Sequence, residues 1–262
     1  MQAVKAERGY LIVAQGEQYH QCARALAKSI KYWMPGAQIA VVGDCKDTVF
    51  NYEIELPHGD QGGLQNDWQV LEASPFRQTI KLESDMILNG SIEHWWQMFE
   101  KQDVVVAQGA CNFYGERTAE RAYRKHLGLN NLPDVYNAIT YWRRSELAAR
   151  FFTTVREIFD NWDQVHLKGW TQPEPDTDTV YAIAITLLGK EQFLLPTSPK
   201  FTHMKGKINF CHGEDWTKEL VWELGAKGLR INTIQQQMPT HYYIKSFAKQ
   251  LEEHYEQLLA SR

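Results

Sequence analysis

The first 43 residues contain the pattern that most restricts the fold of this chain. An apolar run at residues 9–14 is followed by apolar positions at three- and four-residue spacing over residues 19–33, and then by a second apolar run at residues 38–43. This order predicts strand, amphipathic helix and strand. A β-α-β unit of this kind places its two strands parallel, with a right-handed crossover. The chain therefore begins as an α/β protein.

Ligands of parallel sheets bind beyond the carboxyl ends of the strands. Ala14 and Asp44 lie at the ends of the two expected strands, and Tyr19 lies at the start of the intervening helix. We expect these three residues to lie beside a bound ligand. The segment has neither a G-x-G-x-x-G sequence nor a P-loop, so it does not favour a dinucleotide or an ATP phosphate site.

Residues 76–90 predict a central strand that carries two acids, Glu83 and Asp85. Because they are separated by one residue, their side chains point to the same face of an extended chain. Unpaired carboxylates are costly to bury, so we expect them to face a cleft, a counter-charge or a metal ion. Arg77 and Lys81 are the nearby cations that would balance these acids or contact a diphosphate.

Composition and length favour one α/β domain. The chain has 262 residues and a formal net charge of -4, which does not indicate a dedicated nucleic-acid-binding protein. Four widely spaced cysteines suggest neither a zinc site nor a disulfide framework, and no apolar run reaches the roughly 18 residues that cross a membrane. With no signal-peptide pattern at its start, we expect a cytoplasmic protein whose residues 1–220 form the domain and whose residues 221–262 form a helical appendage packed on it.

The second half of the chain contains further polar candidates. Asn137 lies inside an apolar run at residues 134–142, and Asp178 opens an expected helix at residues 179–188, where it would be a natural N-cap. An irregular loop at residues 200–216 contains His203, Lys205, Gly206, Lys207 and His212. Basic residues near 117–125 (Arg117, Arg121, Arg124 and Lys125) and the sequence Tyr141-Trp142-Arg143-Arg144 are candidate contacts to an anionic acceptor.

The order of these features resembles the GT-A type nucleotide-sugar glycosyltransferases over residues 9–216, most closely the glycogenin-like family 8. Glu83-Ser84-Asp85 resembles the Asp-x-Asp motif, with Glu in the first position. Asn137 resembles the Asn of a later strand, and Asp178, with Asp176 as a rival, resembles the acid at a helix start. His203-Met-Lys-Gly206 resembles the start of the family segment H-x-x-G-x-x-K-P-W, although Asn209 stands where its Lys is expected.

The resemblance implies a single GT-A domain, with a mixed, mostly parallel sheet flanked by helices, that transfers a hexose or pentose with retention. The donor would be a nucleotide-diphospho-sugar, by family habit a UDP-sugar. Asp85 and His203 would bind Mn²⁺ or Mg²⁺, with Glu83 as a further ligand or a ribose contact and His212 as the rival histidine. Ala14, Tyr19 and Asp44 would contact the base and ribose of the donor. Ser84, Lys205, Gly206 and Lys207 would also contact the donor, while Asn137 and Asp178 would face the reacting sugar.

Two other functions remain open from the residues alone. A glycoside hydrolase also needs two carboxylates, which Glu83 and Asp85 would supply. A non-enzymatic module that binds sugars or nucleic acid is the second alternative. The acceptor of a transferase is equally open, because the chain also resembles bacteriophage glycosyltransferases, some of which modify hydroxymethylated DNA bases; a glycan is the other candidate. The sequence does not indicate the oligomeric state.

Overall fold

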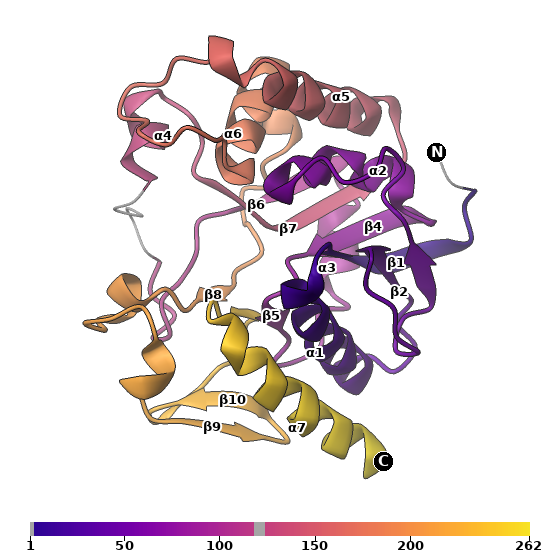
Figure 1. The fold of residues 1–262 in the computed structure, drawn as a ribbon, viewed down its shortest axis with the longest axis vertical. Coiled ribbons are helices and arrows are strands. Elements are labelled where there is room, and N and C mark those ends of the chain that lie inside the picture. Colours follow the sequence, from indigo (N-terminus) through magenta and orange to yellow (C-terminus); the bar gives the residue numbers. More distant parts are fainter. Residues whose placement is uncertain (1–2, 118–123) are drawn as a thin grey trace.

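The computed structural model describes residues 3–117 and 124–262, and its centre is a six-stranded mixed sheet (Figure 1). The strand order is β3-β2-β1-β4-β7-β6. The four strands from β3 to β4 are parallel, and β7 runs antiparallel to both β4 and β6. This confirms the expected mixed, mostly parallel sheet. The bounds are β1 Ala6–Ala14, β2 Ile39–Gly43, β3 Tyr52–Ile54, β4 Phe76–Leu82, β6 Val104–Gln108 and β7 Val135–Arg143.

Helices cover both faces of this sheet because its strands bury both sets of alternating side chains. Along β1, Tyr10 and Ile12 pack in one core with residues of α1 and α3, whereas Leu11 packs in another with residues of α2, α5 and α6. The α-helical bounds are α1 Glu17–Trp33, α2 Val70–Ala73, α3 Trp95–Phe99, α4 Lys125–Leu129, α5 Glu146–Asp160, α6 Thr177–Leu188 and α7 Ala248–Ala260. The 3₁₀ turns are η1 Gly63–Gln69, η3 Trp162–Gln164, η4 Lys190–Gln192, η5 Gly206–Asn209, η6 Trp216–Lys218 and η7 Lys245–Phe247.

The strand order reverses at β1, which has β2 on one side and β4 on the other. Such a switch point opens a crevice beyond the strand ends. We had expected residues 76–90 to form one continuous strand, but they do not. β4 ends at Leu82, a turn contains Glu83 and Asp85, and the short β5, Met86–Ile87, leaves the main sheet.

The last third of the chain adds two small sheets and a helix. β5 pairs with β12, Thr240–His241, which pairs in turn with β8, Thr202–His203. The second small sheet contains β9 Trp222–Gly225, β10 Gly228–Ile231 and β11 Ile234–Gln235. We had expected residues 221–262 to be helical. They are only partly so, because the Gly225–Gly228 turn folds this segment into a hairpin before α7 begins.

Helix α7 lies along α1, which ties the end of the chain to its start (Figure 1). Arg24 Nε lies 2.8 Å from Glu252 Oε1, and Lys28 Nζ lies 2.8 Å from Glu256 Oε2. Beneath these ion pairs, Leu251 and Tyr255 of α7 are buried together with Cys22 and Ala25 of α1. Across residues 3–117 and 124–262, no helix has both the length and the apolar composition to span a bilayer.

Candidate functional site

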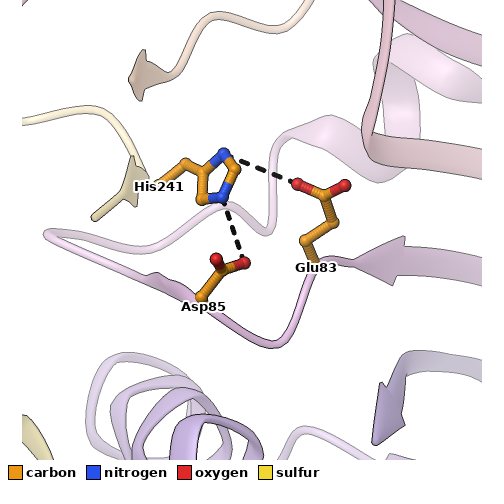
Figure 2. Close-up of side chains that lie close together, drawn as sticks. All are labelled: Glu83, Asp85 and His241. Carbon is orange, nitrogen blue, oxygen red and sulfur yellow. Dashed lines mark ion pairs between the residues drawn. The ribbon is translucent and has the colours of Figure 1, made fainter. Parts of the chain in front are cut away.

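Two acids and one histidine meet beyond the carboxyl end of β4 (Figure 2). Glu83 and Asp85 come from the turn between β4 and β5, and His241 comes from β12. His241 Nε2 lies 3.0 Å from Asp85 Oδ1, and His241 Nδ1 lies 3.5 Å from Glu83 Oε2. One ligand atom from each residue lies within 4.8 Å of the others. A different ring nitrogen of His241 faces each acid, and the three side chains together form a group that could hold a metal ion (Figure 2).

Backbone pairing places His241 opposite the acids. In the antiparallel register of β12 and β5, His241 stands across from Met86, the residue after Asp85. The Tyr242 amide donates to the Asp85 carbonyl oxygen at 3.0 Å. Asn89 fixes the approach of β12, since its side-chain amide donates to the Met238 carbonyl at 2.7 Å and to Thr240 Oγ1 at 2.9 Å. Residues about 155 positions apart are thus held in one site.

The electrostatics of the cluster favour a bound cation. Burial raises the pKa of Glu83 to about 7; His241 opposes this shift and the charge of Asp85 adds to it. Burial also disfavours ionised Asp85, but His241 outweighs it and holds the Asp85 pKa below its ordinary value. For His241, burial lowers the pKa, while Asp85 and Glu83 together raise it to about 9. Two clustered acids therefore call for positive charge, which the imidazole or a metal ion supplies.

The donor atoms fit a divalent metal ion. Two carboxylates and one imidazole give oxygen and nitrogen ligands, a donor set that divalent metal ions use in proteins. Among the described residues, Glu83 Oε2 takes part in no hydrogen bond, so it remains available to a ligand. Behind this set, His203 Nδ1 lies 3.1 Å from His241 Nδ1, and the Tyr136 hydroxyl lies 2.7 Å from His203 Nδ1. His203 is therefore positioned to orient His241 from behind.

The cluster forms part of the wall of a cavity of about 250 Å³ at the switch point of the sheet. Val13 and Gln15 line it from the end of β1, and Tyr19 lines it from α1. Lys245 lines the same cavity, and its Nζ lies 4.9 Å from the centre of the Tyr19 ring. The positive charge of Lys245 also acts on Asp85. The cavity therefore combines an aromatic ring, a cation and the acid cluster.

A buried polar network supports the wall that faces the cluster. Lys81, from β4, forms an ion pair with Asp67, which lies in η1. Asp67 Oδ2 also accepts from Asn137 Nδ2 at 2.7 Å and from the Tyr181 hydroxyl at 2.9 Å. Lys81, Asp67 and Asn137 all line the cavity. We had expected Lys81 to balance Glu83 and Asp85 or to contact a diphosphate, but its ion pair is with Asp67, an acid that we did not single out from the sequence.

Asp178 does not cap its helix, contrary to our expectation. The N-cap of α6 is Asp176, whose side chain accepts from the Thr179 amide at 2.7 Å. Asp178 lies in the first turn, where Oδ1 accepts from the Asn137 backbone amide at 2.6 Å and Oδ2 pairs with Arg124. The helix begins two residues earlier than expected, so Asp178 is directed toward β7. Asn137 and Asp178 are thus in direct contact, and of the two only Asn137 is among the residues that line the cavity.

Other expected site residues lie at different distances from the cavity. Ser84 lines it, whereas Ala14 is buried at the end of β1 and is not among its lining residues. Asp44 accepts from the Gly16 amide at 2.9 Å and lies 2.7 Å from His20 Nε2, beside the cavity rather than in its wall. Arg77 lies at the opposite end of β4, about 20 Å from Glu83 by strand rise, and is exposed next to Glu7. That position does not support a role for Arg77 in donor binding.

The loop after β8 contains the remaining candidates. Gly206 packs so tightly that a β-carbon on it would overlap the Gly213 carbonyl oxygen, so it serves chain packing. Lys205 Nζ lies 5.4 Å from the Tyr243 ring centre, and Lys207 is exposed. His212 is also exposed, and its backbone amide donates to Glu219 at 2.7 Å. Within the described residues, only His241 joins Glu83 and Asp85 in a metal-ligating group.

The basic and aromatic residues considered for an acceptor are dispersed. Tyr141 and Trp142 are fully buried in the core, which contradicts a contact from their rings to an acceptor. Arg143 and Arg144 are held by Asp103 and by backbone carbonyls, and Lys125 begins α4. Arg117 lines a second cavity, and Arg121 lies outside the described residues.

Sequence reasoning missed His241 and Lys245. The sequence from Pro239 to Tyr243 is Pro-Thr-His-Tyr-Tyr, a short strand-like run that contains one histidine. The argument applied to Glu83 and Asp85, that a polar side chain in a buried strand needs a partner, would have selected it. No sequence pattern around Lys245 indicated a site residue, because its position depends on the pairing of β12 with β5.

Known structures share this architecture, although neither a protein-family profile nor a curated protein matches the sequence. The galactosyltransferase LgtC, solved with donor and acceptor sugar analogs, is similar over 94% of this chain and 95% of its own, with 12% identity and a TM-score of 0.55. The glycosyltransferase GlyE of Streptococcus pneumoniae TIGR4 is similar over 98% of this chain and 63% of its own, with 9% identity and a TM-score of 0.58. Mouse xyloside xylosyltransferase 1 is similar over 90% of this chain and 97% of its own, with 8% identity and a TM-score of 0.50. The chain therefore has the fold of the GT-A glycosyltransferases.

Proposed function

We propose that the protein is a metal-dependent glycosyltransferase that moves a sugar from a nucleotide-diphospho-sugar to a hydroxyl acceptor. The observation that carries this proposal is the convergence of Glu83, Asp85 and His241 beside a cavity at the switch point of a GT-A fold. A bound divalent cation would act as a Lewis acid that neutralises the departing diphosphate, worth several kcal/mol. A histidine among the ligands favours Mn²⁺ over Mg²⁺.

The residues of the cavity divide between the parts of the donor. Tyr19 offers its ring to the nucleotide base, beside Val13 and Gln15 at the end of β1. By family habit, that nucleotide is UDP. Lys245 stands next to the acid cluster and donates to the diphosphate as a point charge. Ser84, in the turn between the two acids, is the neighbouring hydroxyl donor.

The sugar end of the site lies toward β7 and α6. Asn137 lines the cavity there, and Asp178 holds the Asn137 backbone amide. Asp67 fixes the Asn137 side chain, so its amide stays in one orientation without moving during the reaction. These residues position the donor sugar for attack by the acceptor hydroxyl. We propose retention of anomeric configuration, in line with the resemblance to family 8.

The decisive experiment measures thermal unfolding with Mn²⁺ alone and with Mn²⁺ plus a panel of UDP-, GDP- and ADP-sugars. A ligand at 100 times its Kd stabilises the native state by about 2.7 kcal/mol, which for a chain of this size raises Tm by roughly 5 °C or more. Nucleoside diphosphate release is then followed for the donors that bind. Chelation should abolish this release, whereas a hydrolase that uses Glu83 and Asp85 would need no metal.

Asp85→Asn should remove the Mn²⁺-dependent rise in Tm, because it removes an anionic ligand. Asp103→Asn is the matched control. Asp103 is an acid that is paired with Arg143 at the β6 edge of the sheet, away from the cluster. It should retain the full Mn²⁺ response. Equal Mn²⁺ responses in both variants, or no response in the unmodified protein, would exclude the metal-dependent transferase.

A further inference from the structure

The Nδ1 atom of His241 faces two other buried side chains as well as Glu83. It lies 3.1 Å from His203 Nδ1 and 3.3 Å from the Tyr136 hydroxyl, and that hydroxyl lies 2.7 Å from His203 Nδ1. Glu83 Oε2 is 3.5 Å from the same His241 nitrogen. The exposed fractions of Tyr136, His203 and His241 are 5%, 2% and 6%, so water does not separate these polar atoms. Their hydrogens must therefore be shared among themselves.

An irregularity in β7 brings Tyr136 to this position. The register between β6 and β7 shifts between Val106 and Ala107, and Tyr136 pairs with Ala107 directly after the shift. Such bulges change the direction of side chains and are common beside active sites. Neighbouring residues of a strand point to opposite faces, and here Asn137 lines the cavity whereas Tyr136 is not among the described residues that do so. Tyr136 therefore reaches the site through His241.

The Tyr136 side chain is held from several sides. Its ring packs at 82° to that of Phe201, with 5.0 Å between the ring centres. The Arg124 guanidinium lies 5.6 Å from the centre of the Tyr136 ring, and Arg124 Nη1 lies 3.0 Å from Asp176 Oδ1 at the start of α6. A side chain that orients a metal ligand needs a rotamer that packing has fixed, and Tyr136 meets this condition.

The three contacts allow one distribution of hydrogens that leaves a His241 nitrogen available to an ion. A hydroxyl and a neutral imidazole each carry one hydrogen on a nitrogen or oxygen atom. When Tyr136 donates to His203 Nδ1, the shortest of the three contacts, its oxygen accepts from His241 Nδ1. The His241 Nε2 lone pair, 3.0 Å from Asp85 Oδ1, is then free for a cation. If Tyr136 donated to His241 Nδ1 instead, the His241 hydrogen would lie on Nε2, where it would exclude the ion.

We propose that Tyr136 is a positioning residue of the metal site, whose hydroxyl accepts the Nδ1 hydrogen of His241 so that Nε2 is the nitrogen that binds the ion. His203 completes the chain as the acceptor of the Tyr136 hydrogen. This inference rests on the proposed function, and it adds the ligand atom and a residue behind it. Removing such an outer partner of a ligating histidine typically weakens metal binding by about 10- to 100-fold.

The first test measures the Kd for Mn²⁺ from the EPR signal of the free ion. Tyr136→Phe keeps the ring and removes the hydroxyl, so it should raise this Kd by about tenfold or more. Tyr141→Phe is the matched control, because Tyr141 is a buried tyrosine of the same strand whose hydroxyl donates to Gln78 at 3.2 Å. It should bind Mn²⁺ like the unmodified protein. Thermal unfolding without metal checks that both variants are folded.

A second measurement locates the hydrogen and needs no Tyr136 variant. Long-range ¹H–¹⁵N NMR of the protein with labelled histidines is recorded with Cd²⁺, a diamagnetic ion, in the place of Mn²⁺. The signals of His241 are those that the His241→Asn variant lacks. We expect the hydrogen on Nδ1 and the ion on Nε2, as the contact to Tyr136 requires.

The outcomes separate this inference from the proposed function. Equal Mn²⁺ affinities for Tyr136→Phe and Tyr141→Phe, or Cd²⁺ on Nδ1 of His241, would overturn the role of Tyr136 and leave the transferase standing. Absence of Mn²⁺ binding to the unmodified protein would refute the metal site and this inference together. Mn²⁺ binding that depends on Tyr136, without turnover of any nucleotide-sugar, would support the role of Tyr136 and refute only the transferase.

Discussion

The ion pair between Lys81 and Asp67 gives the sharpest test of how the cavity wall is held. Both side chains are nearly inaccessible, with exposures of 3% for Lys81 and 9% for Asp67. Asp67 also accepts hydrogen bonds from Asn137 and Tyr181, so three elements depend on its charge. Asp67→Asn leaves the Lys81 ammonium buried without its counter-charge. Lys81→Met keeps the length of the stem and removes the charge.

The expected cost follows from burial. Removing one partner of a buried pair destabilises a protein by about 3–5 kcal/mol, because the remaining charge is uncompensated. In a chain of this size that lowers Tm by roughly 10 °C. The double variant Lys81→Met with Asp67→Asn removes both charges, so it should be no less stable than either single variant. The coupling energy between the two sites is then about 3 kcal/mol or more.

Urea unfolding of the four proteins, followed by tryptophan fluorescence, measures this double-mutant cycle. The pair Arg143 and Asp103 is the control, because its side chains are 47% and 26% exposed and its coupling should stay below about 1 kcal/mol. Additive losses at positions 81 and 67, or a coupling no larger than that of the control pair, would refute the argument that Asp67 neutralises Lys81 in the cavity wall.

Three further outcomes are expected. Gly206→Ala should lower Tm, since its β-carbon would overlap the Gly213 carbonyl oxygen. Gly36→Ala should leave Tm unchanged, because a β-carbon there meets no atom within 4 Å, and scanning calorimetry compares the two variants. Lys245→Ala should raise the donor KM by about tenfold or more while the Mn²⁺ shift in Tm persists, because the proposed diphosphate contact is lost and Glu83, Asp85 and His241 all remain. Burial opposes the ionised form of Glu252, but Arg24 and Lys28 outweigh it and hold the Glu252 pKa below 4.5. Glu252→Gln should therefore lower the free energy of unfolding by about 1 kcal/mol at pH 7. That difference should shrink as pH falls below about 4.5 through the folded-state pKa, and urea unfolding at several pH values checks it.

Local patterns predicted the parts of the fold that depend on neighbouring residues. The β-α-β start and the acids at the end of β4 follow from apolar periodicity and from the cost of burying carboxylates, whereas the mixed sheet was implied by the family resemblance. The partnership of Asn137 with Asp178 was also accessible, because the resemblance assigns both residues to one place. The N-cap was misplaced because Asp176 and Asp178 have equal capping propensity, and only Thr179 shows which one is used.

The remaining parts depend on pairing between distant segments. His241 reaches the acids because β12 inserts between β5 and β8, and a strand of two residues has almost no periodicity to recognise. The sequence from 200 to 216 drew attention to His203 and His212, since a loop rich in His, Lys and Gly matches a family segment. The fold uses that loop to hold the segment after β6, through Asn209 and the Phe113 amide, and to place His203 behind His241.

Because His241 lies on β12, the proposed metal ion would couple its own binding to the docking of the C-terminal segment. A cation shared by Glu83, Asp85 and His241 would tie the turn after β4 to β12, whose register is otherwise held by a few hydrogen bonds. We therefore expect Mn²⁺ to slow hydrogen exchange most at the Tyr242 amide, which donates to the Asp85 carbonyl. Amides in the core of β2, such as that of Ala40, should exchange at nearly the same rate with and without Mn²⁺. If Mn²⁺ slowed exchange equally at the Tyr242 and Ala40 amides, the ion would stabilise the whole domain without specifically tying β12 to the turn after β4.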